Sequence, residues 1–368
     1  MPRTFALLAA LALAACNLGE RVSAPIDGLE ATRFGLPDVV VSPGQSIQAA
    51  VDAAGPNAVI HLEPGLYAEA VTVTAPGVKI VGLTDQAGNG PIITNPGGAA
   101  NGITVRTGAN DFALVGVTVR GFGRNGVLLS AIDGFLLSRV TAQDNGAYGL
   151  FPVRSANGVI EHSVASGHGD AGLYVGQSRA VTMRRNVVFG NVVGIEASNS
   201  SDIKLLANDA HDNSNGILVV LLPGRLITTA SDILVSGNTV TGNNRPNFAA
   251  PGDLVAAVPA GTGILIVGAD RVRAEDNHVT GHEFIGLGVG SSLILALLSN
   301  TPPEAFGDIE PNPDGVEVRN NVVTGNGTQS PIPFLPAVDL LWDGAGVGNC
   351  WLGNTFGSAA PPNLPSCS

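Results

Sequence analysis

The chain has 368 residues, of which 13% are charged and 5% aromatic, and it contains 49 glycines. Its formal net charge of −12, with Lys79 and Lys204 as the two lysines, excludes a basic nucleic-acid-binding surface. A strongly polyanionic glycan would also be repelled unless Ca²⁺ bridged it or arginines gathered locally. Few aromatic residues and many glycines favour one elongated solenoid with an aliphatic core over two globular domains.

The N-terminus carries a predicted targeting signal. Arg3 is followed by an apolar run, 5–15, that is too short to span a bilayer. The run ends in Leu13-Ala14-Ala15-Cys16, which resembles the bacterial lipobox. The resemblance implies a signal peptide over 1–15 and lipidation of Cys16. Because Asn17 is not the aspartate associated with retention in the inner membrane, we expect an exported protein anchored in the outer membrane, facing the periplasm or the cell surface.

An ordinary secretory peptide with a chance cysteine is the alternative to this lipid anchor. Residues 16–37 show no periodicity and are interpreted as a tether. Beyond them, Ser46 is placed to cap a short helix and Gly55 to end it. One face of that helix is apolar, comprising Ile47, Ala50, Val51 and Ala54. We expect it to cover the open apolar end of the solenoid, as terminal repeats must.

A repeating glycine marks the middle of the chain at spacings of 22 to 24 residues. The positions are Gly102, Gly126, Gly149, Gly172, Gly194, Gly216, Gly263 and Gly286, with one double interval. An aliphatic residue, an outward position and another apolar residue follow most of these glycines. Alternation of this kind predicts short strands with one face inside, and a fixed period predicts stacked coils.

A second ladder of asparagines runs in register with the glycines. It begins at Asn186 and Asn191 and recurs at 208–213, 238–243, 277–282 and 321–326. Asparagine suits the corner between two strands because it tolerates a left-handed backbone and its amide can bond to a stacked neighbour. We therefore predict an all-β fold, a parallel β-helix, over residues 38–357.

This pattern resembles the right-handed parallel β-helix repeat proteins of the pectin-lyase-like superfamily. The resemblance covers most of the chain and implies a single-stranded right-handed solenoid with coils of about 22–24 residues. Residues 358–368 then form a C-terminal tail. Cys350 and Cys367 bracket a Gly/Pro-rich segment, and an exported compartment permits the disulfide that we expect between them. A redox or metal pair is the alternative.

Three insertions break the period, at 221–230, 244–260 and 291–313. The first and third leave the solenoid just after a glycine-marked strand, so they should emerge on one side and wall a surface there. The third insertion contains the apolar run 293–298, which we expect to pack onto the body as a lid.

The candidate site is the outward position two residues after each glycine. On successive coils it is occupied by Leu128, Phe151, Tyr174, Glu196 and Leu218. The same level also holds Tyr148, Arg154, Asp170 and Gln177. Rings stack on sugar faces and polar groups bind hydroxyls, so we predict a polysaccharide-binding lateral face that uses Tyr148, Phe151, Gln177 and Glu196. A purely structural stack of side chains is the alternative.

The segment 148–153, Tyr-Gly-Leu-Phe-Pro-Val, partly resembles the Tyr-Gly-Phe-Asp-Pro-His motif of β-helical mannuronan epimerases. Phe151 and Val153 replace the aspartate and the histidine, so the acid and base of that motif are missing there. If the protein is catalytic, the next coil would supply the base as Asp170 or His168. The proton donor would be Tyr174 or Tyr148, and Arg154 would neutralise a uronate carboxylate.

The sequence as a whole predicts a monomeric, membrane-anchored lipoprotein that binds a polysaccharide on its lateral face. Catalysis as a polysaccharide lyase or C5-epimerase is the first alternative. A structural or accessory periplasmic role is the second. We predict no metal site and no cofactor, with Ca²⁺ left open.

Overall fold

The computed structural model describes residues 38–368 of the chain. The predicted signal peptide (1–15), the tether (16–37) and Cys16 lie outside the described residues. Within the described part, no helix is long and apolar enough to cross a membrane.

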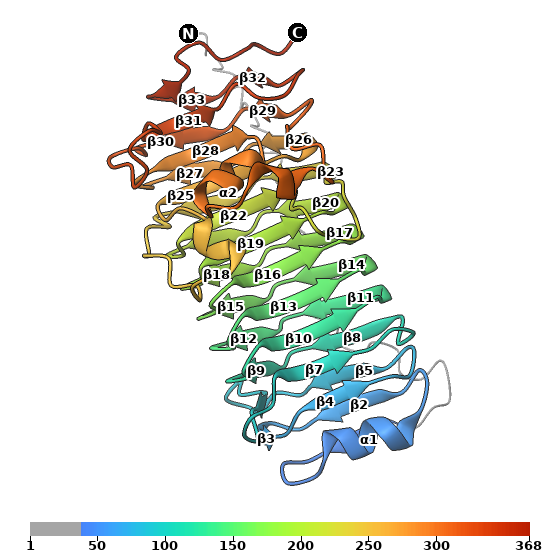
Figure 1. The fold of residues 1–368 in the computed structure, drawn as a ribbon. Helices are drawn as coiled ribbons and strands as arrows, with labels where there is room; N and C mark the ends of the chain where they lie inside the picture. Colours follow the sequence, from blue (N-terminus) through green and yellow to red (C-terminus); the bar gives the residue numbers. More distant parts are fainter. Residues whose placement is uncertain (1–37) are drawn as a thin grey trace, which may run out of the picture. The chain divides into compact units, whose positions relative to one another are not determined.

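The described chain winds into stacked coils whose strands form three parallel sheets (Figure 1). Sheet A has 12 strands: β1 (Val39–Val41), β2 (Val59–Leu62), β5 (Lys79–Gly82), β8 (Phe112–Val115), β11 (Asp133–Ser138), β14 (Ala156–Glu161), β17 (Arg179–Arg184), β20 (Ser201–Leu206), β23 (Ser231–Ser236), β26 (Asp270–Glu275), β29 (Glu317–Arg319) and β32 (Cys350–Leu352).

Sheet B has 11 short strands: β3 (Gly65–Ala68), β6 (Pro91–Thr94), β9 (Thr118–Arg120), β12 (Thr141–Gln143), β15 (Val164–Ser166), β18 (Val187–Phe189), β21 (Asp209–His211), β24 (Thr239–Thr241), β27 (His278–Thr280), β30 (Val322–Thr324) and β33 (Thr355–Phe356).

Sheet C also has 11 strands and contains the repeating glycines: β4 (Val71–Val73), β7 (Asn101–Val105), β10 (Asn125–Ser130), β13 (Tyr148–Val153), β16 (Ala171–Gly176), β19 (Val193–Ser198), β22 (Asn215–Val220), β25 (Thr262–Val267), β28 (Ile285–Gly290), β31 (Val338–Trp342) and β34 (Ala359–Ala360).

Each coil contributes one strand to each sheet in the order C, A, B, and every pairing is with the coil before or after. This is the predicted single-stranded right-handed parallel β-helix, the hand that parallel crossover connections take. The inward row of sheet C pairs residue by residue as Val127, Leu150, Leu173, Ile195, Ile217, Ile264 and Leu287. All seven are fully buried, which confirms the predicted aliphatic row.

Helix α1 (Ile47–Ala54) covers the N-terminal end of the stack, as predicted (Figure 1). The Ser46 side chain accepts a hydrogen bond from the Ala49 amide, and Gly55 ends the helix with φ 75°. Ile47 and Val51 are buried in the main core. The helix therefore closes the apolar end of the solenoid.

The C-terminal end is closed by the tail. A disulfide joins Cys350 to Cys367, as predicted. The tail also takes part in the solenoid, because β34 pairs with β31 and Ser366 forms a bridge to Trp351. Sheet pairing thus continues beyond residue 357, the end that the sequence predicted for the β-helix.

Two polar ladders run inside the corners. In one, the Nδ2 of each asparagine donates to the Oδ1 of the asparagine one coil on, at 2.9–3.0 Å, from Asn186 through Asn208, Asn238, Asn277 and Asn321 to Asn354. The other contains Asn145, His168, Asn191, Asn213, Asn243, His282 and Asn326 and ends on Asp339. Buried amides in this arrangement have partners on both sides, which removes the cost of burying them.

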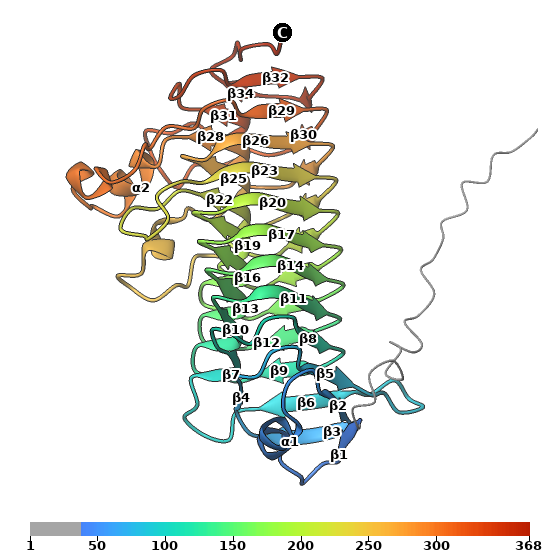
Figure 2. The same ribbon diagram turned by 90° about the vertical axis from the view of Figure 1, so that its right-hand side faces the viewer.

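The second and third insertions lie on one side of the stack, against sheet C (Figure 2), and the first reaches the same face through Leu222 and Arg225. The second carries the 3₁₀ helix η2 (Leu254–Ala257), and the third carries α2 (Leu293–Leu298) and the 3₁₀ helix η3 (Pro303–Phe306). Leu295 and Ala296 of α2 are buried in a second apolar cluster on the outside of sheet C. The expectation that the third insertion packs down as a lid is confirmed.

Candidate functional site

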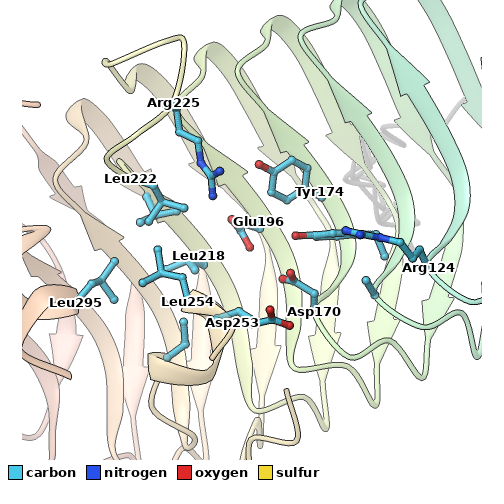
Figure 3. Close-up of a pocket in the computed structure, with 15 residues that line it drawn as sticks. Arg124, Asp170, Tyr174, Glu196, Leu218, Leu222, Arg225, Asp253, Leu254 and Leu295 are labelled. Carbon is cyan, nitrogen blue, oxygen red and sulfur yellow. The ribbon is translucent and has the colours of Figure 1, made fainter. Parts of the chain in front are cut away.

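The outer face of sheet C and the insertions enclose a cavity of about 210 Å³ over β13, β16, β19 and β22 (Figure 3). Its floor holds side chains at outward strand positions, and in register Tyr174 pairs with Glu196 and Glu196 with Leu218. Loop residues Arg225, Asp253 and Leu295 come from the three insertions, one from each. The insertions therefore cover this face, and Tyr174 and Glu196 are only 7% and 5% exposed.

Three carboxyl groups line this cavity (Figure 3): Asp170 in the corner before β16, Glu196 on β19 and Asp253 from the second insertion. Burial raises the pKa of Asp170 to about 6, helped by the Asp253 charge and opposed by a hydrogen bond from Tyr148 and by Arg225 and Arg124. Burial also raises the pKa of Glu196 well above its usual value, and the Asp170 charge adds to this shift. A pair of carboxyls with raised pKa values in a cavity is a typical arrangement for proton transfer.

Two tyrosines stand beside the carboxyls. The ring of Tyr148 stacks on Phe151 with centroids 4.2 Å apart and meets Tyr174 edge-on at 5.1 Å. Burial, together with the Asp170 and Glu196 charges, raises the pKa of both hydroxyls. Both tyrosines therefore carry neutral hydroxyls at neutral pH, and the Tyr148 hydroxyl lies beside the Asp170 carboxyl.

The arginines of the cavity are Arg225 and Arg124, neither of which the sequence singled out (Figure 3). Arg225 is contributed by the first insertion, and Arg124 by the corner before β10. The predicted Arg154 lies outside the cavity, where its Nη2 donates to the Ser130 Oγ at 3.2 Å. It lines a separate open depression of about 330 Å³, whose other wall includes Arg225. The position suited to neutralising a carboxylate in the cavity is therefore that of Arg225, which corrects the role predicted for Arg154.

Gln177 and His168 also differ from their predicted roles. The Gln177 Oε1 accepts a hydrogen bond from the Leu226 amide at 3.0 Å and so holds the first insertion in place. His168 is fully buried inside the solenoid, where its Nδ1 lies 2.7 Å from the Asn191 Oδ1. It occupies a ladder position and does not line the cavity, so the prediction of His168 as the base is wrong. His168 stands one repeat period before Asn191 in the sequence, and this spacing could have identified it as a member of the asparagine ladder.

The wall opposite the carboxyls is aliphatic (Figure 3). It is formed by Leu218, Val220, Leu222, Leu254, Val255, Val258 and Leu295. Leu218, Val258 and Leu295 also line a second cavity of about 70 Å³, which lies further along sheet C over β25 and β28 and is almost entirely apolar. The site thus has a polar half and an apolar half, arranged along the axis of the solenoid.

Within residues 38–368, no three His, Cys, Asp or Glu side chains come together in a group that could hold a metal ion. The polar half therefore offers acid–base and hydrogen-bonding groups from the chain itself.

A family model described as "Right handed beta helix region" matches residues 101–244. The mannuronan C-5 epimerase AlgE6 A-module of Azotobacter vinelandii superposes with a TM-score of 0.61 at 18% identity, covering 86% of this chain and 95% of that one. The AlgE4 A-module of the same organism gives 0.59 at 18% identity, with coverage of 88% and 96%. A variant of the periplasmic alginate epimerase AlgG gives 0.52 at 12% identity, with coverage of 86% and 83%. No curated protein sequence matches the chain significantly. At these identities the likeness establishes the right-handed β-helix fold.

Proposed function

We propose that this right-handed parallel β-helix protein binds a polysaccharide on its lateral face and holds one sugar residue in the cavity beside Asp170 and Glu196. The observation that carries the proposal is the convergence of three carboxyls, two tyrosines and two arginines in one cavity of about 210 Å³. At about 10–15 Å³ for each water-sized group, that volume suits the roughly twelve non-hydrogen atoms of a hexose. The structural neighbours named above as mannuronan and alginate epimerases lend support, since they share the fold.

The rest of the polysaccharide has a path outside the cavity. The depression of about 330 Å³ adjoins the cavity at Arg225 and contains Phe151 and Arg154. A wider depression of about 500 Å³ shares Arg154 with it and reaches Arg179 at the corner between sheets C and A. Arginines thus gather along this path although the whole chain has a formal net charge of −12. Such local clustering is what an acidic sugar chain needs to approach an acidic protein.

A polysaccharide lyase or C5-epimerase activity is a second candidate, favoured by the placement of two tyrosine hydroxyls and the Asp170 carboxyl in one cavity. In this scheme ionised Asp170 removes the proton from the carbon next to the sugar carboxylate, and the electron pair passes into that carboxylate beside Arg225. A tyrosine then returns a proton to the opposite face of the carbon, which inverts it. If instead the bond to the glycosidic oxygen breaks, the tyrosine protonates that oxygen and an unsaturated sugar remains. A structural or accessory role in the periplasm is the third candidate.

Tyr174→Ala and Asp170→Asn test the site on a polysaccharide panel that is read for both binding and products. We expect Tyr174→Ala to weaken binding about tenfold, because a packed ring is lost from the floor of the cavity. Asp170→Asn should lower any turnover by about 10²–10⁴-fold. Since only the ionised carboxylate is a base, wild-type turnover should rise with pH through about 6. Asp202→Asn, at an exposed position of β20, is the matched control.

Binding without new products would favour the binding protein, and turnover would favour the enzyme. Neither binding nor turnover by a folded wild-type protein would favour the accessory role. Unchanged affinity in both cavity variants, with intact folding by circular dichroism, would argue against this cavity as the site.

We further propose that the protein is exported and held at the outer membrane by lipid on Cys16. Cys16→Ser should then move the protein from the membrane fraction to the soluble fraction, because it removes the attachment atom for the lipid. Fractionation of cells expressing each form, followed by immunoblotting, measures the change. A Cys16→Ser protein that stays in the membrane fraction would contradict the anchor.

A further inference from the structure

The apolar half of the lateral site continues past the place where a sugar would sit. The 70 Å³ cavity adjoins the larger one at Leu218, Val258 and Leu295, and it extends along sheet C to β28. Neighbouring strands of a sheet lie about 4.8 Å apart, so β22 and β28 are separated by roughly 10 Å. The whole site therefore has the outline of a ligand with a polar head and an apolar extension.

Gly288 lines this extension and has no side chain that could enter it. Along the outward row of sheet C, Gly288 stands in register between Leu265 on β25 and Leu341 on β31. A Cβ at this position would lie 3.0 Å from the Leu265 Cδ2, 3.3 Å from the Ile285 Cγ2 and 3.9 Å from the Leu341 Cβ. The backbone there is ordinary strand, so this glycine is not required by its conformation. Its effect is to let the Leu265 and Ile285 side chains lie close to the strand, and all three residues line the cavity.

An apolar wall could also serve to exclude water from the carboxyls or to pack against α2. Neither role accounts for this cavity. An aliphatic wall beside Glu196 keeps water from the carboxyls, but the Gly288 cavity lies three strands further along, beyond that contact. Packing of α2 onto sheet C would by itself leave no cavity of about 70 Å³ there, since close-packed cores avoid voids. The volume is therefore best explained as space for a ligand.

From this geometry we infer that the saccharide bound at the lateral site carries an acyl chain of roughly four to eight carbon atoms, and that this chain occupies the apolar cavity at Gly288. The inference rests on the proposed function, because the sugar must lie beside Asp170 and Glu196 for the chain to reach Gly288. The length follows from the roughly 10 Å between β22 and β28 and from the 70 Å³ volume, which holds about five to seven water-sized groups.

Alginate, pectin, xylan and glucomannan serve as probes, each unmodified and each esterified to the same low degree with acetyl, butyryl, hexanoyl or dodecanoyl groups. We expect the affinity of the wild-type protein to rise from acetyl to hexanoyl, by up to about fourfold for each methylene that enters the cavity. The rise should stop before dodecanoyl, because the cavity is then full.

Gly288→Val fills the cavity and provides the decisive variant. A Cβ there would lie 3.0 Å from the Leu265 Cδ2 and 3.3 Å from the Ile285 Cγ2, so these two side chains must shift by a few tenths of an ångström for the variant to fold. We expect this variant to bind unmodified polysaccharide with the affinity of the wild type. The increase in affinity that the hexanoyl group confers should be at least tenfold smaller than in the wild type. Gly123→Val is the matched control, because it adds the same side chain at a position where the nearest atom to the new Cβ is 3.5 Å away. It should leave the affinity increase from hexanoyl unchanged. Melting curves establish that both variants fold.

Equal affinity for the unmodified and hexanoyl forms would overturn the inference of an acyl chain but would leave the proposed polysaccharide site in place. An acyl gain that persists in a folded Gly288→Val protein would likewise overturn it. Absence of binding by every form would overturn both proposals. Binding of the hexanoyl form alone, lost in Gly288→Val, would support both.

Discussion

Replacing Ile195 by aspartate is expected to prevent stable folding of the β-helix. Ile195 is fully buried and pairs in register with Leu173 on one side and Ile217 on the other. An aspartate there would place a carboxylate among aliphatic side chains with no partner, at a cost of several kcal/mol. Because each coil is stabilised by its two neighbours, the damage would spread along the stack.

Urea denaturation followed by circular dichroism measures this loss as a fall in the transition midpoint, or as absence of a folded baseline. Thr182→Asp is the matched control, since Thr182 points outward from β17 and pairs with Lys204. A surface change of this kind should alter the free energy of unfolding by no more than about 0.5 kcal/mol. If Ile195→Asp denatured at the same urea concentration as the wild type, the inward register of sheet C would be wrong.

Acid should destabilise the solenoid through the two histidines of the polar ladder. His168 receives the amide of Asn145 on its Nε2 side, at 3.2 Å, and its Nδ1 lies 2.7 Å from the Asn191 Oδ1. His282 has the same two kinds of partner in Asn243 and Asn326. Only a neutral ring with its proton on Nδ1 satisfies both neighbours, because a protonated Nε2 would face another donor.

Burial lowers the pKa of both histidines from 6.5 to about 4. The unfolded chain therefore binds more protons than the folded one between these values, and the stabilising contribution, complete above pH 6.5, is lost as the pH falls toward 4. At about 1.4 kcal/mol for each pKa unit, the loss is about 3 kcal/mol for each histidine. For both together it is comparable to the whole stability of many domains.

The double variant His168→Asn/His282→Asn isolates this effect from the protonation of carboxyl groups, which it leaves unchanged. Asparagine is the residue that other coils place in this ladder, so the variant should fold. Urea denaturation of both proteins at pH 7 and pH 4.5 provides the comparison, and we expect the variant to lose several kcal/mol less than the wild type. Equal losses in the two proteins would contradict the assignment of the ladder histidines as neutral.

The direction of the ladder explains why it ends on a carboxylate. From Asn191 onward each amide donates toward the C-terminus, and the last donor, Asn326, bonds to the Asp339 Oδ1 at 2.9 Å. Asp339 also accepts from the backbone amides of Gly357 and Ser358 in the tail. A carboxylate suits the end of a chain of donors because both its oxygens accept, and a charge-assisted bond is stronger than a neutral one.

The sequence by itself determined the repeat and everything that depends on it. The glycines of sheet C, the corner asparagines and the alternating aliphatic residues are local signals that recur once per coil, and stacking turns each of them into a row. The capping helix was predictable from Ser46 and Gly55 because capping depends on neighbouring residues. The positions of Tyr148, Tyr174, Asp170 and Glu196 on one face follow from the same register.

Only the tertiary structure decided what surrounds that face. Arg225, Asp253 and Leu295 reach the cavity from three aperiodic insertions, and no periodicity predicts where such loops fold back. Their cover leaves Glu196 buried and Asp170 only partly exposed, and this burial is what shifts their pKa values. His168 and Asp170 are two residues apart in the sequence, yet one faces the interior ladder and the other faces the cavity. The corner between strands decides that, because its backbone does not follow the simple alternation of a strand.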